Sequence, residues 1–210
     1  RAHGRPPPGP GRAASGGGAV VRDVCAALLH HPVLDRERRV VTTAITNLDL
    51  HDIARSAHAF GLRRYYVAHP VQAQRALADR VRQHWTEGSG ALRIPDRVAP
   101  LAALTVVDSL EAALRDLGGG GAAELWTTSG VSGGARTLTF AAGRARLRSE
   151  GPPVLIAFGT GWGLADGVHD LAAFRLEPIR SPRPDGYNHL SVRAAAAIVF
   201  DRLLGEGAAR

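Results

Sequence analysis

The sequence of 210 residues lacks lysine and methionine and contains a single cysteine, Cys25. One cysteine cannot form a disulfide within the chain, and it excludes a zinc site built from cysteines. We therefore expect no bound metal and a cytoplasmic location. The lack of lysine excludes the usual phosphate loop, because that motif requires one. The lack of methionine, even at position 1, indicates a fragment or a misassigned start.

Long apolar runs are also missing. No apolar segment approaches the roughly 20 residues of a membrane-spanning helix, so we expect no membrane partner. Residues 1–19 are rich in Gly, Pro and Arg and lack the apolar core of a signal peptide. This composition cannot bury enough apolar surface to offset its ordering entropy, and it predicts a disordered tail. Residues 20–210 are long enough for one domain with a full core.

The positive charge is carried by arginine alone. All 26 basic residues are arginine, and the net charge is +7. The planar guanidinium group binds phosphate through paired hydrogen bonds and stacks on bases. A basic chain favours an anionic partner such as nucleic acid. Charge alone leaves a second interpretation open, a basic tail together with ordinary solvated arginines.

Apolar runs that alternate with helical patterns predict the fold class. Strands are expected at 24–30, 40–46 (a strand or only extended), 63–69, 105–107, 124–129, 153–159 and 174–179. Helices are expected at 47–61, 70–85, 109–117, 137–147, 164–169 and from 190 onward. Segment 31–39 is expected to be a polar loop, and Asn47 or Asp49 is expected to cap the first helix. This order predicts an α/β protein with a mostly parallel sheet and helices on its faces.

Two segments near the C-terminus could form a binding site. Asn188, His189 and Ser191 lie at the start of the last helix, where free backbone N–H groups can hold a polar ligand. FGTGWGLAD, residues 158–166, follows a buried strand, and its glycines allow the backbone to approach a ligand closely. An ordinary helix cap and a structural turn are the alternatives. Ser191, His189 and Asp185 are not expected to form a hydrolytic triad, because a helix start does not orient them as one.

The first predicted helix carries a candidate for acceptor chemistry. In NLDLHDIAR, Arg55 follows Asn47 by about two helical turns and follows Asp52 by three residues. An arginine fixed by an acidic neighbour can orient a phosphate or stabilise a developing alkoxide. A solvated helix face with an ion pair explains the same pattern.

Three separated segments together resemble a known family. HHPVLDRERRVVTTAITNLDLHDIARSAHAFGLRRYYVAHP, VLIAFGTGWGLAD and LEPIRSPRPDGYNHLSVRAAAAIVFDRLLG are similar to the bacterial S-adenosylmethionine (SAM)-dependent RNA methyltransferases of the SPOUT superfamily. Within it they look closest to an uncharacterised single-domain group. The resemblance runs from about residue 20 to 205. It implies an α/β domain with a C-terminal trefoil knot, a tRNA or rRNA substrate, and a homodimer that pairs through the knot helices.

The resemblance also implies the site. SAM would lie in the knot between three loops. Apart from the resemblance, the charges of Arg55, Arg63, Arg64 and the arginine-rich tail predict salt-dependent binding of RNA. The implied cofactor-binding residues are Thr128, Ser129, Phe158, Gly159, Thr160, Gly161, Gly163, Leu164, Ile179, Arg180, Asn188, His189, Leu190 and Ser191. In the branch of the family that methylates ribose 2'-oxygen, the first motif has an Asn and a later catalytic Arg, and Asn47 and Arg55 stand at similar positions.

This sequence departs from that branch at two places. Thr160 and Trp162 occupy the glycine turn that usually carries a Glu, and His189 replaces an Asn of the third motif. We expect Arg55 to orient or activate the acceptor with help from Asn47 and His189, and the acceptor is a ribose 2'-oxygen or a base nitrogen. A non-catalytic RNA-binding protein and a phosphate-binding hydrolase are the alternatives.

Overall fold

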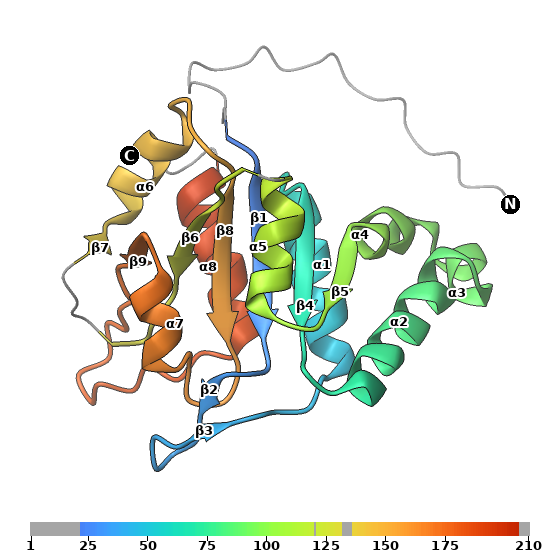
Figure 1. Cartoon of the computed structure of the whole chain (residues 1–210), viewed down its shortest axis with the longest axis horizontal. Helices are drawn as coiled ribbons and strands as arrows, with labels where there is room; N and C mark the ends of the chain where they lie inside the picture. The colour runs from blue at the N-terminus through green and yellow to red at the C-terminus, as the bar shows by residue number, and fades with distance from the viewer. Residues whose placement is uncertain (1–21, 120, 132–135, 206–210) are drawn as a thin grey trace, which may run out of the picture.

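The computed structural model describes residues 22–119, 121–131 and 136–205 (Figure 1). The predicted disordered tail at 1–19 lies outside the described residues. A seven-stranded sheet with the order β5-β4-β1-β8-β6-β9-β7 forms the centre, and its paired strands run parallel. Its strands are β1 (Val24–Leu29), β4 (Arg64–Ala68), β5 (Leu104–Val107), β6 (Glu124–Thr127), β7 (Thr137–Leu138), β8 (Val154–Gly159) and β9 (Phe174–Leu176).

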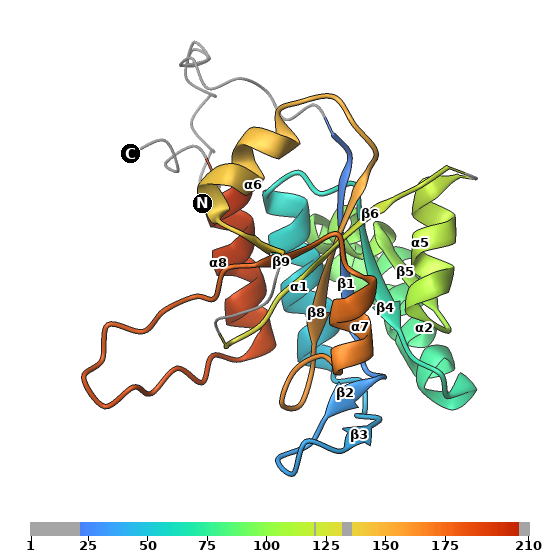
Figure 2. The same cartoon turned by 60° about the vertical axis from the view of Figure 1, so that its left-hand side comes forward.

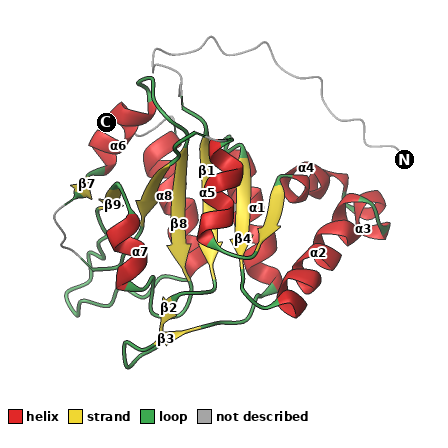
Figure 3. Ribbon diagram, in the orientation of Figure 1, coloured by secondary structure: helices red, strands yellow, loops and turns green. Residues whose placement is uncertain are grey.

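Helices lie on both faces of this sheet, as the element order predicted (Figure 3). They are α1 (Asn47–Ala59), α2 (Gln72–Thr86), α3 (Ser89–Arg93), the 3-10 helix η1 (Pro95–Arg97), α4 (Val98–Ala102), α5 (Leu110–Gly118), α6 (Phe140–Leu147), α7 (Asp166–Leu171) and α8 (Val192–Leu204). A separate antiparallel ribbon of β2 (Val33–Leu34) and β3 (Val40–Val41) lies beyond the carboxyl ends of β1 and β8.

Alternate residues of the central strands supply two cores. On β1, Val24, Ala26 and Leu28 face the core that includes buried residues of α1 and α8. The intervening Cys25 and Ala27 face the second core, which includes buried residues of α5 and α7. Every residue of β1 is buried, since successive side chains of a strand point to opposite faces and helices cover both. This explains why β1 is an unbroken apolar run rather than an alternating one.

Several predicted elements differ in detail from the structure. Thr46, not Asn47 or Asp49, caps α1, and its hydroxyl accepts a hydrogen bond from the Asp49 N–H. The last helix begins at Val192 because Ser191 is its cap. The predicted loop at 31–39 contains β2, and the predicted helix at 137–147 is the short strand β7 followed by α6.

The short helices α3, η1 and α4 had no sequence signal. Each spans three to five residues, and Gly88, Gly90, Pro95 and Pro100 interrupt any helical period there. The helical periodicity of apolar residues can be recognised only in segments that are longer than these helices. The confirmed part of the prediction is therefore the α/β class, the mostly parallel sheet and the helices on both faces.

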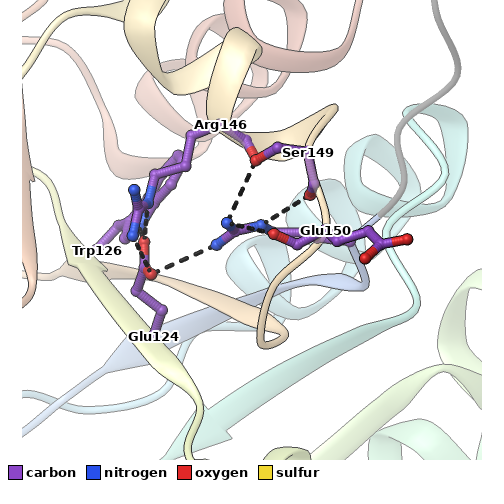
Figure 4. A network of polar contacts seen from close by, with 6 residues as sticks. Glu124, Trp126, Arg146, Ser149 and Glu150 are labelled. Atoms are coloured by element: carbon purple, nitrogen blue, oxygen red, sulfur yellow. Dashed lines mark hydrogen bonds and ion pairs between the residues drawn. The ribbon is translucent and has the colours of Figure 1, made fainter.

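A buried ion network holds the amino-terminal edge of the sheet together (Figure 4). The Glu124 carboxylate accepts hydrogen bonds from Arg146 Nε at 2.6 Å, from Arg146 Nη2 at 2.8 Å and from Trp126 Nε1 at 2.7 Å. Arg22 Nη1 lies 3.4 Å from the same carboxylate. Arg22 Nε also donates to the Ser149 carbonyl at 3.1 Å. The network joins the start of β1, strand β6 and the end of α6.

Hydrogen bonds from Arg146 hold the pKa of Glu124 below its usual value, and the carboxylate is the charge that compensates Arg22. We predict that Glu124→Gln lowers the free energy of unfolding by about 3–5 kcal/mol, because it leaves a buried guanidinium without its partner. Urea unfolding at neutral pH measures the loss. The matched control Asp79→Asn, which removes an ion pair with Arg82 on the surface of α2, should cost less than about 1 kcal/mol. Equal losses in the two variants would contradict the structural role of the network.

Candidate functional site

A cavity of about 890 Å³ opens at the carboxyl edge of the sheet. This size lies in the range of pockets for small molecules and cofactors. Strand order reverses between β1 and β8, since β4 and β5 follow β1 on one side and β6 lies on the other. Ligands of open α/β sheets bind at such a reversal, outside the carboxyl ends of the strands. The lining residues fall within 38–49, 128–131, 158–169, 175–179 and 188–199.

The glycine turn after β8 forms one wall of the cavity and is fixed against the β2 ribbon. The Trp162 N–H donates to the Leu34 carbonyl at 2.8 Å, and the Leu34 N–H donates to the Gly163 carbonyl at 2.9 Å. Gly161 and Gly163 have φ angles of +59° and +103°, which disfavour other residues. A Cβ at Gly161 would also lie 2.7 Å from the Leu34 carbonyl oxygen. The turn is therefore both a structural device and part of the cavity.

The loop between β9 and α8 supplies another wall and projects from the body of the protein (Figure 2). Asn188 Nδ2 donates to the Ile179 carbonyl at 2.7 Å, so its amide ties the two arms of the loop together. The Ser191 hydroxyl accepts from the Ala194 N–H at 3.3 Å and caps α8. Ser191 therefore both caps α8 and lines the cavity.

A buried carboxylate joins α1 to α8 at the cavity. Asp49 lines the cavity with only 8% of its surface exposed and accepts a hydrogen bond from the Thr46 hydroxyl at 2.6 Å. Arg193 Nε lies 3.6 Å from Asp49, and Arg193 Nη1 lies 3.5 Å from Asp52. Asp52 is thus paired with Arg193 and not with Arg55. The expectation that Asp52 fixes Arg55 is wrong, because α8 packs beside α1 and brings a competing arginine.

A group of buried histidines lies next to the cavity wall. His30 Nδ1 lies 3.1 Å from the Thr43 hydroxyl, which in turn contacts the hydroxyl of Thr160. The Val71 N–H donates to His69 Nδ1 at 3.0 Å, so His69 carries its proton on Nε2 and donates it to the Thr43 carbonyl at 2.9 Å. Burial lowers the pKa of His30 to about 4, with a smaller contribution from His69. Both rings are therefore neutral near pH 7 and hold Thr43 in place.

His169 is a further neutral histidine on the cavity wall. Its Nδ1 atom lies 2.9 Å from the Thr127 hydroxyl at the end of β6. Burial, followed by the charge of Arg175, lowers the pKa of His169. Sequence reasoning missed His169, Thr43 and Glu177 as cavity residues and considered Asp49 only as a helix cap. Thr43 and Glu177 follow β3 and β9, whereas Asp49 and His169 lie in the first turn of α1 and the last turn of α7, and none of these positions is distinctive in the sequence.

The structure brings most of the predicted cofactor residues to one place. All of them except Arg180 line the cavity, and Arg180 lines a neighbouring hollow of about 230 Å³. His189 lines the cavity, whereas the exposed Asn47 and Arg55 do not. These placements locate the residues, and their roles stay predictions.

The two other arginines expected to bind RNA lie at the opposite edge of the sheet. Arg63 and Arg64 are at the amino end of β4 and are paired with Asp23 and Asp116. Among the described residues there is no group of three or more His, Cys, Asp or Glu side chains that could hold a metal ion. In the same ranges, no helix is long and apolar enough to span a membrane.

The fold is shared with solved methyltransferases. The SpoU methyltransferase AviRb from Streptomyces viridochromogenes aligns with a TM-score of 0.53 and 16% identity, over 88% of this chain and 60% of that one. At this identity the likeness shows the fold alone, and it agrees with the predicted SPOUT-like α/β class. The trefoil knot itself stays a prediction.

Comparisons of the sequence give a more specific relationship than the fold does. The model of the SAM-dependent RNA methyltransferase family matches residues 23–205, and the chain therefore belongs to that family. A tRNA (guanine-N(1)-)-methyltransferase of Nitratidesulfovibrio vulgaris is 44% identical over 185 residues, 88% of this chain and 43% of that protein. An uncharacterised protein of Aquifex aeolicus is 32% identical over 88% of this chain and 89% of its own length. This chain thus spans less than half of the first relative and nearly all of the second.

The cavity fits the cofactor of the family. SAM combines a flat apolar base with charged and hydroxyl groups, and the cavity offers apolar walls from Phe158, Leu164 and Val199 together with the carboxylate of Asp49. A Cβ added to Gly130 or to Gly163 would meet no atom within 4 Å, so both leave open space where they line the cavity. The resemblance implied SAM, and family membership confirms this prediction. The hydrolase alternative finds no support.

The pKa of His30 predicts how stability depends on pH. An unfolded histidine titrates near pH 6.5, whereas folding lowers the pKa of His30 to about 4. The unfolded chain therefore binds more protons between these values, so stability is fully present above about pH 6.5 and is lost as pH falls toward 4. At pH 4.5 the loss that comes from His30 amounts to about 2–3 kcal/mol.

Urea unfolding of the natural chain and of His30→Asn between pH 4.5 and 7.5 measures this contribution. The other buried histidines and the carboxylates titrate in both proteins, so the difference between the two curves reports His30. We expect the natural chain to lose more stability on acidification than the variant. Parallel curves would show that His30 is protonated as easily in the folded protein as in the unfolded one.

Proposed function

We propose that this chain transfers a methyl group from SAM to a tRNA nucleotide that enters the cavity at the carboxyl edge of the sheet. The observation that carries the proposal is that segments following β3, β6, β8 and β9 converge on one cavity of cofactor size. Family membership and the name of the relative from Nitratidesulfovibrio vulgaris support an RNA substrate, and that name supports tRNA. The homodimer, the cytoplasmic location and the trefoil knot belong to the same proposal. Analytical ultracentrifugation of the full chain measures whether it forms a homodimer.

The acceptor atom cannot be carried over from that relative. More than half of the relative lies outside the matched region, and the guanine-N1 activity in its name can belong to that other part. The relative from Aquifex aeolicus matches over 89% of its length, so a protein of this size occurs without the additional region. Both acceptors implied by the sequence, a ribose 2'-oxygen and a base nitrogen, therefore belong to the proposal.

The residues of the chain must position the acceptor and deal with its proton. When bound, SAM supplies an electrophilic methyl group. Binding in a fixed orientation converts the transfer into an effectively unimolecular step. His189 is exposed at the cavity and can accept the acceptor proton, directly or through one water molecule. Asp49 is less suited to this task, since Thr46 and Arg193 already occupy its carboxylate.

Filling the cavity tests the cofactor site. Ala195 of α8 lines the cavity, and Ala195→Phe should weaken SAM binding about 10-fold or more, because the added ring occupies space within it. Methyl transfer from labelled SAM to unfractionated tRNA should fall in parallel. Mass spectrometry of the nucleosides from methylated tRNA then identifies the acceptor atom.

The matched control is Ala141→Phe, which adds the same ring on the exposed face of α6 and should leave binding and transfer unchanged. Calorimetry measures SAM affinity for both variants. Normal SAM affinity in a folded Ala195→Phe protein would place the cofactor elsewhere. SAM binding without transfer to any RNA in the natural chain would favour a non-catalytic RNA-binding protein.

Arg55 is proposed to contact the phosphate backbone of the RNA. It lies on α1 six residues beyond Asp49, about 9 Å further along the helix axis from the cavity. No described residue forms an ion pair with its exposed side chain, so its charge is available to a phosphate. The catalytic role implied by the resemblance requires instead that the acceptor reaches this arginine.

Steady-state kinetics of Arg55→Ala separate the two roles. A phosphate contact predicts a higher KM for tRNA, a salt slope of binding reduced by about 1, and substantial rescue by Arg55→Lys. Activation of the acceptor predicts that kcat falls by at least about 100-fold with little rescue by lysine, because a point charge cannot reproduce the planar fork. We expect the first result. A loss confined to kcat would show that Arg55 acts on the acceptor and not on the phosphate backbone.

A further inference from the structure

Three aromatic side chains form a cluster at the rim of the cavity, which we call the aromatic rim: Trp162, Tyr187 and His189. The ring centroids of Trp162 and His189 lie 5.2 Å apart with an interplanar angle of 80°, and those of Tyr187 and His189 lie 6.0 Å apart. Trp162 is 50% exposed and Tyr187 is 60% exposed. The rim therefore joins the glycine turn after β8 to the loop before α8 and presents aromatic surface to solvent.

The fold itself does not account for this exposure. The chain has three tryptophans. Trp126 is fully buried and bonded to Glu124, and Trp85 packs against the guanidinium of Arg97 at 4.6 Å. In contrast, no described residue accepts a hydrogen bond from the indole N–H of Trp162, and half of its surface faces solvent. A large exposed aromatic residue beside a cavity indicates a surface that a ligand covers.

We propose that the aromatic rim is a stacking platform on which Trp162 holds an unpaired base of the substrate RNA. The inference rests on the proposed function, an RNA substrate at this cavity. Every nucleobase has a flat face, and stacking on tryptophan or tyrosine is a general way to bind single-stranded RNA. Arginines lie nearby, since Arg180 lines the adjoining hollow and Arg38 lines the same cavity, where it is paired with Asp166.

Other occupants of this surface are less consistent with the geometry. Trp162 and His189 line the cavity, whereas Tyr187 does not and extends the aromatic surface outward, beyond the space that the base of SAM would fill. A second copy of this chain would bring the same positive charge to a rim that is already next to arginines. A base of the RNA adds a flat apolar face and carries a phosphate of opposite charge.

The platform restricts the kind of RNA that the enzyme accepts. Bases in a duplex are stacked on each other and present only their edges, so a duplex cannot place a base on Trp162 without opening. The acceptor nucleotide, or a neighbour of it, must therefore lie in a loop, bulge or end of the tRNA. The enzyme should bind a single-stranded RNA more tightly than a duplex of the same sequence.

The test uses the full chain, Trp162→Ala, Trp162→Phe and the control Leu92→Ala, which removes an exposed apolar side chain of α3 away from the cavity. The probes are a single-stranded RNA of about 12 nucleotides, the duplex of the same sequence, and unfractionated tRNA. Fluorescence titration follows the quenching of Trp162 on stacking in the natural chain. Calorimetry follows the affinity for each RNA and for SAM in every protein, and ultracentrifugation follows oligomeric state.

We expect Trp162→Ala to weaken binding of the single strand by about 5- to 100-fold and to raise the KM for tRNA. SAM affinity should change less than the affinity for RNA, because half of the Trp162 surface faces solvent. Trp162→Phe should recover much of the affinity but lack the quenching that Trp162 provides. Leu92→Ala should behave as the natural chain does. Binding of the duplex, already weaker, should change little in any variant.

Four results would overturn the platform. If Trp162→Ala keeps the single-strand affinity and KM of the natural chain while tRNA is methylated, the platform is wrong and the proposed function stands. If its SAM affinity falls instead, Trp162 serves the cofactor, and if its oligomeric state changes, the rim is an interface between copies. If the natural chain neither binds nor methylates RNA, the proposed function fails together with the platform.

Discussion

The pairing of β1 with β8 is the constraint on which the rest of the molecule depends. Six residues of each strand are in register, from Val24 opposite Val154 to Leu29 opposite Gly159. The side chains of both strands are buried on both faces, so neither strand can shift by one residue without moving its apolar side chains into the wrong core. This register fixes the edge at which His30 and the glycine turn leave the sheet. The position of the cavity follows from it.

The cavity is built from irregular backbone that the regular elements hold in place. Backbone hydrogen bonds join the glycine turn to Leu34 of β2, and hydroxyl contacts join Thr160 to Thr43. Neutral His30 and His69 hold Thr43 from the other side. A loop that is bonded on both sides loses little further freedom when a ligand binds, which favours affinity. His30 and His69 are buried close to the cavity because they take part in holding Thr43.

The charges of the protein are distributed unevenly between structure and surface. The arginines of the amino-terminal edge are satisfied by Glu124, Asp23 and Asp116, and they serve the fold. The cavity is lined by Asp49, Asp166 and Glu177 as well as by Arg38 and Arg175. Arg193 compensates the buried Asp49, and Arg38 is paired with Asp166. A net charge of +7 therefore does not by itself locate a nucleic-acid surface. The proposed RNA surface rests on aromatic exposure beside a cavity as much as on charge.

The sequence by itself determined the class of the fold, and nearly all of the cofactor-binding residues that it predicted line the cavity. The strands 24–29 and 154–159 are continuous apolar runs because helices cover both of their faces. Such a run lies within a few consecutive residues, so it can be recognised from the sequence. The glycine turn and the cap at Ser191 are equally local, because backbone conformation and helix ends depend on neighbouring residues.

Only the tertiary structure decided which distant residues are partners. Asp52 pairs with Arg193 of α8 and not with Arg55 of its own helix. The hydroxyl groups of Thr43 and Thr160 are in contact although the two residues are 117 positions apart in the sequence. Arg63 and Arg64 were expected to contact RNA, yet they lie at the edge of the sheet opposite the cavity. Sequence spacing predicts contacts within one helix or turn. Contacts between strand ends depend on the order of the strands in the sheet, and that order is set by the packing of the whole chain.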